Sequence, residues 1–238
     1  MGFDLLSTAN NHAEDFGREC RSQTEKALDE VGVAWSGRPG TVATVEVDGA
    51  RVAMVGFHTN PNSHDVNDPV AAELVVRSLA ATHDYVIVSF HGGAEGSKQQ
   101  HVPDKREIFY GEDRGHLRAF ARTVIAAGAD VVIGHGPHVL RGLEVVDGHL
   151  VAYSLGNFAT YGGMNLTGPL GLTMVLDARL GPDGTFLGGK IHPAKQIRPG
   201  GPRLDPDGAI IPLVRDLSRS DFGTAAAKIA DDGTVSPP

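Results

Sequence analysis

Apolar runs that end abruptly in polar residues recur along the first part of the chain. Residues 3–8, 85–90 and 131–133 form short, largely apolar runs with little alternation. Such runs are typical of strands that are buried on both faces of a sheet. Each run stops at a polar cluster, and the three clusters are Ala9-Asn10-Asn11-His12, His91-Gly92-Gly93 and Gly134-His135-Gly136-Pro137-His138.

Three other segments have apolar residues at helical spacing. One helix is expected to end at Gly32, a second to begin at Asp68-Pro69, a favoured capping and first-turn pair, and a third to span 114–127 before Gly128. The spacing predicts one inward stripe in each helix. The predicted stripes are Cys20, Thr24, Ala27, Leu28 and Val31; Val70, Leu74, Val75 and Leu79; and Leu117, Phe120, Ala121, Val124 and Ile125. On its stripe, Cys20 is interpreted as a small buried hydrophobe rather than a nucleophile.

Two Asp-Gly pairs, Asp48-Gly49 and Asp147-Gly148, each separate two apolar runs and predict tight β-hairpins. Strands that alternate with helices, together with hairpins, indicate an α/β domain with a mixed sheet.

The character of the chain changes from about residue 160, where glycine and proline punctuate short strand-like pieces at 172–176 and 186–191. The pattern then predicts an exposed loop at 198–202, a short helix near 220–229 and a frayed tail over 231–238. We therefore expect one domain in two parts. Residues 1–160 form its core, and residues 161–238 wrap around that core as strands and a tail.

Composition narrows the function classes. The 238 residues carry 21 Lys and Arg against 29 Asp and Glu, and this net charge of −8 argues against a nucleic-acid or anionic-membrane binder. The single cysteine excludes an internal disulfide and a multi-cysteine metal site. No apolar run approaches the ~20 residues of a membrane span, and Met1-Gly2-Phe3-Asp4 does not resemble a signal peptide. After these exclusions, the 11 histidines are the residues that suggest metal binding or acid–base catalysis.

The polar clusters at the strand ends suggest a metal site. Ligands bind at the carboxyl edge of α/β sheets, and neutral imidazole is a common ligand of transition metals. Asn11, His91, His135 and His138 are the candidate ligands. Each alone has a simpler explanation: a hydrogen-bonded histidine, a turn at 135–138, or a helix cap at Asn11. Their joint arrangement favours the metal.

These motifs also resemble a known family. Thr8-Ala9-Asn10-Asn11-His12, His91-Gly92-Gly93-Ala94-Glu95, Gly134-His135-Gly136-Pro137-His138 and Tyr153-Ser154-Leu155-Gly156-Asn157-Phe158 follow one another in the order of the CapA family. This is the poly-γ-glutamate capsule biosynthesis group of the calcineurin-like metallophosphatase superfamily. The resemblance runs from Gly2 to about Phe158 and less sharply through Asp221-Phe222-Gly223.

The resemblance implies a four-layer α/β/β/α sandwich with a two-metal site. Asn11, His91 and His135 would hold one divalent ion, His138 the other, and His12 would act as the acid beside the leaving group. Two cations about 4 Å apart polarise a phosphoryl oxygen and activate a water. The donor set accepts Mn, Fe, Zn or Co.

The chain departs from the family pattern at its start. The pattern places two aspartate-bearing motifs before Gly2, and Ala13 stands where the superfamily has an acidic residue after Asn-His. We expect a sandwich truncated at its N-terminus, with Met1 an internal residue of a longer natural chain. We also expect weakened metal affinity and either an unpaired sheet edge or an uncovered apolar face.

Other residues give weaker indications of a functional role. Glu95 and Arg141 flank the histidine motifs and are candidates for contact with an anionic small-molecule or polymer substrate. Residues 104–113 are expected to form a loop over the site. The remaining histidines, His58 among them, are scattered, and most are expected to be surface or hydrogen-bonded residues.

The favoured hypothesis is a CapA-type protein of capsule or poly-γ-glutamate synthesis at the bacterial cell envelope, which hydrolyses a phosphoester or related bond with divalent metal. Capsule-synthesis components are its expected partners. One alternative is a non-catalytic binding or scaffold protein of the envelope with a degenerate metal site. The other is a cytosolic phosphodiesterase unrelated to capsule. The sequence leaves these three open.

Overall fold

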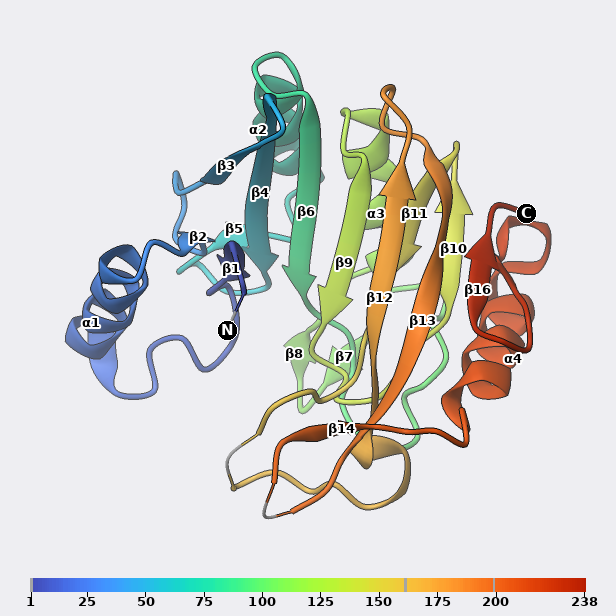
Figure 1. The fold of residues 1–238 in the computed structure, drawn as a ribbon. Coiled ribbons are helices and arrows are strands. Elements are labelled where there is room, and N and C mark those ends of the chain that lie inside the picture. Colours follow the sequence, from blue (N-terminus) through green and yellow to red (C-terminus); the bar gives the residue numbers. More distant parts are fainter. Residues whose placement is uncertain (1, 161, 199) are drawn as a thin grey trace.

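A seven-stranded mixed sheet forms the centre of the molecule in the computed structural model, which describes residues 2–160, 162–198 and 200–238 (Figure 1). The strand order is β10-β11-β9-β6-β4-β3, with β5 beside β4. β4, β6, β9 and β11 run parallel, whereas β3 and β10 pair antiparallel to their neighbours. The strands are β3 (Ala43–Val47), β4 (Ala50–His58), β5 (His64–Asp65), β6 (Tyr85–His91), β9 (Val131–His135), β10 (Leu143–Val146) and β11 (His149–Ala152).

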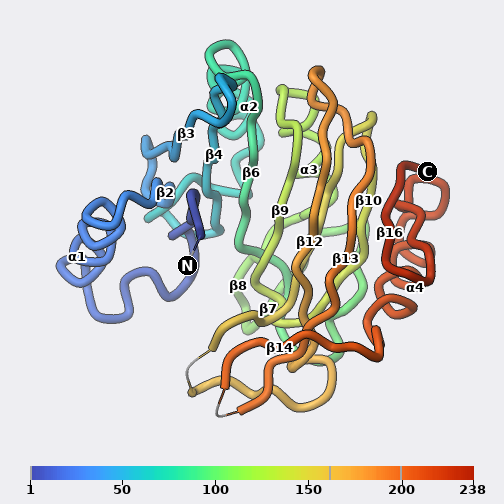
Figure 2. The backbone as a smooth tube through the Cα atoms, viewed as in Figure 1, coloured from blue at the N-terminus to red at the C-terminus, as the bar shows by residue number. Residues whose placement is uncertain are grey.

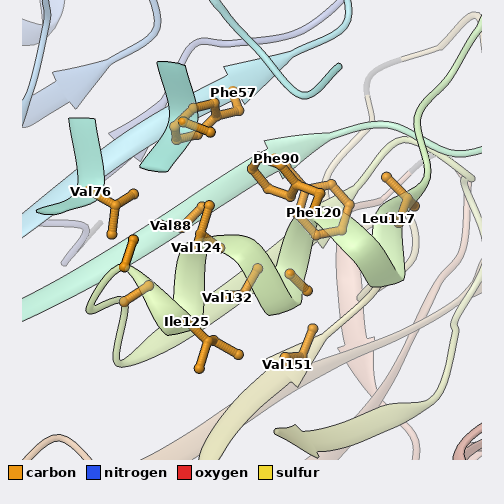
Figure 3. Packing of buried hydrophobic residues seen from close by; sticks show 14 of the residues in the cluster. Phe57, Val76, Val88, Phe90, Leu117, Phe120, Val124, Ile125, Val132 and Val151 are labelled. Carbon is orange, nitrogen blue, oxygen red and sulfur yellow. The ribbon is translucent and has the colours of Figure 1, made fainter. Parts of the chain in front are cut away.

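Helices α2 (Pro69–Ala80) and α3 (Leu117–Ala126) cover one face of this sheet. Figure 3 shows their side chains packed against Phe57, Phe90 and Val132 from the strands. The five-residue stripe predicted for α3 is buried throughout, and the Asp68 side chain caps α2 by accepting from the Ala71 N–H. The stripe predicted for α2 is wrong at Val70 and Leu74, which are 67% and 64% exposed. The helix turns Ala72, Val76 and Leu79 inward instead, and their i, i+4, i+7 spacing places these three on one face.

A second sheet packs against the opposite face of β10 and β11 (Figures 1 and 2). Leu150 and Ala152 of β11 share a core with Met174 and Ile191 of the second sheet and Val214 of α4 (Ile210–Phe222). The helix layer, the two sheets and α4 agree with the expected α/β fold, and α4 contacts β10 of one sheet and β13 and β15 of the other. The second sheet contains β12 (Leu172–Leu180), β13 (Phe186–Gln196), β14 (Pro202–Leu204), β15 (Lys228–Ile229) and β16 (Thr234–Ser236).

The C-terminal part differs from the sequence prediction. The last helix, α4, begins about ten residues earlier than predicted, because Ile210, Ile211 and Val214 form the stripe that enters the core between the sheets. The predicted frayed tail is wrong as well. Its β16 pairs with both β13 and β15, and Val235 is fully buried. Pro199 of the predicted exposed loop lies outside the described residues.

The N-terminal strand β1 (Leu5–Ser7) was predicted as a central buried strand, and this is wrong. It pairs in parallel with β2 (Ala34–Ser36) alone and is half-buried. The pair packs on β4 at Gly56, where an added Cβ would lie 2.9 Å from the Ser36 carbonyl oxygen. Glycine at this position therefore lets β1 approach the large sheet and place the residues that follow it near the end of β4.

Helix α1 (Gly17–Glu30) buries charge rather than an apolar stripe. Arg21 and Glu25 are its buried residues, and Cys20 is exposed, so the predicted stripe is wrong. The reason is a network of ion pairs beneath the helix. The Arg21 guanidinium pairs with Glu14 at 3.1 Å and Glu25 at 3.2 Å, and Arg38 pairs with Glu25 at 2.7 Å.

Both predicted hairpin turns are confirmed. Asp48 and Gly49 have φ of 51° and 83°, and Asp147 and Gly148 have φ of 48° and 88°. Left-handed backbone at both central residues fits the twist of antiparallel strands. The segment 104–113 forms a small hairpin of β7 (Ile108–Phe109) and β8 (Glu112–Asp113). No helix among the described residues has the length and apolarity to cross a membrane.

Candidate functional site

Three parallel strands of the large sheet end in histidine at the same level. The register pairs His58 of β4 with His91 of β6, and His91 with His135 of β9. The ring centres of His58 and His91 are 5.0 Å apart, and those of His91 and His135 are 4.9 Å apart. Because parallel strands share an edge, the three imidazoles form one row, which we call the histidine row.

Alternation along the strands decides which face the row occupies. Phe57 and Phe90 point toward α3, where their rings contact Phe120. The next residues, His58 and His91, therefore point to the opposite face. Ile87 and Ile133 lie on that face and are only partly buried, so it is incompletely covered.

Two members of the histidine row, His58 and His91, are buried without hydrogen-bond partners. His58 is 2% exposed and His91 6% exposed. All four nitrogens of these two rings are buried and have no hydrogen-bond partner. A buried polar group without a partner costs about 1–3 kcal/mol, so native proteins usually avoid it. Such atoms are therefore candidates for binding a ligand, which would supply the bonding partner that the protein lacks.

Burial holds the row in its neutral form. It lowers the pKa of His58 to about 4, and the charge of Arg114 lowers it further. The Asn60 side chain lies near the ring and opposes this lowering, but it makes no hydrogen bond of normal geometry to either ring nitrogen. Burial also lowers the pKa of His135 to about 4, with a further lowering by the charge of His58. Burial and the charges of His135 and His58 lower the pKa of His91 well below its ordinary value. At neutral pH the rings are therefore uncharged, which is the form that binds metals.

Asn11 approaches the same edge from the loop after β1. Its Oδ1 is buried without a hydrogen-bond partner. Asn11 and His58 line a cavity of about 360 Å³, and Glu112 and Asp113 of the β7–β8 hairpin lie across it. The segment predicted as a loop over the site thus supplies two carboxylates to the cavity. His12 is exposed, and its Nδ1 lies 2.8 Å from Asp15 Oδ2.

His138 is held apart from the row by its own partners. Its backbone has φ of 63°, in the left-handed region. The ring Nδ1 lies 2.8 Å from Asn157 Oδ1, and Nε2 lies 3.5 Å from Glu95 Oε2. These three residues line a second cavity, of about 300 Å³, with apolar walls that include Met164 and Leu170.

The two residues proposed for substrate contact have different surroundings. Glu95 is partly exposed and lies between His138 and Arg114, whose Nη2 is 2.8 Å from Glu95 Oε1. Arg141 is fully buried. Its guanidinium donates two parallel hydrogen bonds of 2.9 and 2.8 Å to Glu107, so in this structure Arg141 holds the fold and is closed to a substrate.

The structure brings Asn11, His91 and His135 to one edge, while His138 and Glu95 form a neighbouring group. Sequence reasoning missed His58 and Arg114. The signal for His58 was present, since the strand 51–57 also ends in a polar cluster, His58-Thr59-Asn60. Arg114 is 1% exposed and gave no signal, because an arginine next to a helix is usually at the surface.

The chemistry of the donors fits a metal, but their arrangement does so only in part. Imidazole nitrogen and amide oxygen suit a first-row transition metal, and the donor atoms of Asn11, His58 and His91 are buried without partners. Across 2–160, 162–198 and 200–238, however, no three His, Cys, Asp or Glu side chains converge closely enough to hold an ion as they stand. As they stand, these donors do not enclose an ion, and His138 is engaged with Asn157 and Glu95.

Comparisons with known proteins agree with the motifs. The sequence model of the family described as "Bacterial capsule synthesis protein PGA_cap" matches residues 1–161. The chain is 30% identical over 177 residues to the capsule biosynthesis protein CapA of Bacillus anthracis, across 66% of this chain and 40% of that protein. It is 31% identical over 175 residues to the PGA biosynthesis protein CapA of Bacillus subtilis (strain 168), across 66% and 43%. A crystal structure of a hypothetical protein from Thermus thermophilus matches 86% of this chain and 77% of that one, at 18% identity and a TM-score of 0.44.

The chain spans less than half the length of these two curated relatives. The family match nevertheless covers more than half of its 238 residues and includes the histidine row, Asn11 and the Asn157 motif. The chain therefore belongs to the bacterial capsule synthesis protein family PGA_cap.

Proposed function

We propose that this protein acts in the synthesis of a bacterial capsule of the poly-γ-glutamate kind at the cell envelope, as a divalent-metal-dependent hydrolase of a phosphoester or related bond. The family membership supports the role in capsule synthesis, since both curated relatives are named for capsule or PGA biosynthesis. The expected substrate is an anionic small molecule or polymer, and the expected partners are capsule-synthesis components.

One observation carries the hydrolase proposal. At one sheet edge, the buried His58 and His91 rings have unpartnered nitrogens, and His58 lines a cavity together with Asn11, whose amide oxygen also has no partner. Asn11, His91 and His135 would hold one ion of Mn, Fe, Zn or Co there. When bound, such an ion polarises the bond to be cleaved and activates a water.

The chain's own residues supply the proton chemistry. Asp15 Oδ2 lies 2.8 Å from His12 Nδ1 and so orients the ring, and in this proposal His12 donates a proton to the departing oxygen. The carboxylates of Glu112 and Asp113 beside the cavity pair with Arg114 and Arg106, so their charges are offset within the chain. The positive charge of a bound ion would add to the attraction of an anionic substrate.

The test measures metal content and hydrolysis together. We expect close to one zinc or manganese per chain after dialysis against trace metal, and hydrolysis of a chromogenic phosphodiester by the loaded protein. His135→Ala should lose both, because it removes one of the proposed ligands. His83→Ala, at a half-buried histidine outside the site that bonds Thr44, is the matched control and should lose neither.

The scaffold alternative rests on the arrangement of the same residues. In the described part of the chain no three ligand side chains converge, and His138 already has partners on both ring nitrogens. A non-catalytic envelope protein would bind little metal or would bind it without hydrolysis. Stoichiometric metal with no turnover of phosphomonoesters, phosphodiesters or γ-glutamyl peptides would favour this alternative.

A further inference from the structure

We propose that His58 is a ligand of the same metal ion, so that the site consists of His58, His91 and His135 with Asn11. This inference rests on the proposed function, because it concerns the ion that the hydrolase would use. It adds a residue from a different strand, β4, to the set that the motifs indicated. The argument depends on position, on unsatisfied nitrogens and on ring spacing.

The position of His58 is fixed by the backbone of the sheet. β4 pairs with β6 from Val52–Tyr85 to His58–His91 without a register shift. β6 pairs with β9 in the same way up to His91–His135. His58 and His135 therefore flank His91 at one level, and the paired strands hold the three Cα positions rigidly.

Hydrogen bonding sets His58 and His91 apart from the histidines elsewhere in the protein. Histidines outside the site have polar partners, and removing them from water is thereby compensated. Those pairs are His64 with the Gly40 N–H, His83 with Thr44, His101 with Asp221, His116 with Asp104, His149 with the Asp130 carbonyl and His192 with Asp177. His58 and His91, by contrast, bury both ring nitrogens without a partner.

A purely packing role does not account for this. If His58 served only to fill space beside Phe57 and His91, an apolar ring would do so without two unsatisfied nitrogens. A bound ion removes the penalty by taking one nitrogen of each ring. The same reasoning applies to the Asn11 Oδ1, which faces the cavity that His58 lines.

The spacing of neighbouring rings, which follows from the spacing of paired strands, allows two imidazoles to share an ion. With metal–nitrogen bonds of ~2.1 Å and a tetrahedral angle, the centres of two coordinated rings lie about 5 Å apart. The observed separations are 5.0 and 4.9 Å. The nitrogens do not converge as they stand, so binding requires rotation of the side-chain torsions that brings the two outer rings, His58 and His135, toward each other beside His91. The cavity of about 360 Å³ next to His58 gives room for that rotation and a route for the ion.

The ligand set predicts the class of metal. Three imidazoles and an amide oxygen favour Zn, Co or Fe, whereas Mg and Ca prefer sites built of oxygen alone. The test therefore uses Zn²⁺ for affinity, by competition with a chromophoric chelator, and Co²⁺ for its visible absorption, which reports the number and geometry of ligands.

The decisive variant is His58→Phe, which keeps a ring of similar size and removes the nitrogens. We expect its Zn²⁺ affinity to fall at least tenfold and its Co²⁺ absorption to change in intensity and position. His83→Phe is the matched control and should bind as the unmodified protein does. His91→Ala should lose binding. Far-UV circular dichroism checks the fold, and His58→Gln replaces His58→Phe if that variant does not fold.

Three outcomes separate the possibilities. Weaker zinc binding and an altered cobalt spectrum in His58→Phe, with His83→Phe unchanged, support the inference. Unchanged binding in His58→Phe together with loss in His91→Ala overturns the inference and leaves the proposed function standing. Absence of stoichiometric zinc or cobalt in the unmodified protein overturns both.

Discussion

Two groups of buried polar residues in this protein differ in whether their polar atoms have hydrogen-bond partners. Arg141 and Glu107 are 0% and 6% exposed, and the guanidinium and carboxylate satisfy each other with two parallel hydrogen bonds. His58 and His91 are buried to a similar degree, and their ring nitrogens have no partner. The first group is complete within the chain, whereas the second is not.

This difference separates buried polar residues that stabilise the fold from buried polar residues that serve a functional site. A satisfied buried pair fixes geometry and offers nothing to a ligand. An unsatisfied buried group costs stability, and a protein keeps that cost where the group acts on something else. By this criterion Arg141 belongs to the scaffold of the fold, and the histidine row belongs to the site.

The largest effect is expected at the ion pair. Arg141→Met leaves the Glu107 carboxylate buried without its partner, and we expect a loss of about 3–5 kcal/mol in the free energy of unfolding. Urea denaturation at pH 7.5 measures it. Arg141→Met combined with Glu107→Leu should recover much of the loss, because no unpaired charge remains. A loss below about 1 kcal/mol for the single variant would place the pair outside the scaffold.

A smaller effect is expected from pH in metal-free protein. The pKa values of His58 and His135 are lowered to about 4 in the folded protein, and an unfolded histidine titrates near 6.5. Between these values the unfolded chain binds more protons, so stability rises with pH and falls as the solution is acidified below about 6.5. From pH 7.5 to 5.5 we expect a loss of roughly 1 kcal/mol for each histidine of the row.

Urea denaturation in the presence of a chelator at the two pH values measures this loss. His58→Phe should reduce the pH dependence, because it removes one of the titrating groups. His83→Phe, at a half-buried position outside the histidine row, serves as the control. An identical pH dependence in His58→Phe would show that His58 is protonated as readily in the folded chain as in the unfolded one.

The smallest expected effect is a gain in stability rather than a loss. In metal-free protein at pH 7.5, His58→Phe should raise the free energy of unfolding by up to about 1 kcal/mol, because an apolar ring replaces one with two unsatisfied nitrogens. Thermal and urea unfolding measure the change. Destabilisation by more than about 1 kcal/mol would show that the imidazole makes a favourable contact within the chain, which would remove the contrast with Arg141.

Much of the fold could be predicted from local pattern. The α3 stripe and both Asp-Gly hairpins were correct, because helical spacing and left-handed turn residues act over a few positions. Predictions that depended on distant partners failed. Cys20 was placed inside, although Arg21 and Glu25 occupy the buried face of α1 through ion pairs with Glu14 and Arg38.

The candidate site also has one part that local sequence pattern predicted and one part that only the tertiary structure placed. The motifs pointed to Asn11, His91 and His135 because polar residues directly follow apolar strands, and these residues do meet at one edge. Strand register decided the rest, since it aligned His58 with His91 across two strands. Tertiary packing also closed Arg141 against Glu107, which no local pattern near either residue indicated.

By itself, the sequence determined the α/β class, the strand ends that carry histidine and the family motifs, because each is written in residues close together along the chain. The tertiary structure alone decided which polar residues are satisfied. Satisfaction depends on pairs such as Arg141–Glu107, 34 positions apart, and on partners that His58 and His91 lack. Burial and hydrogen bonding are properties of neighbours in space, and they are what distinguish a residue that holds this fold from one that serves its site.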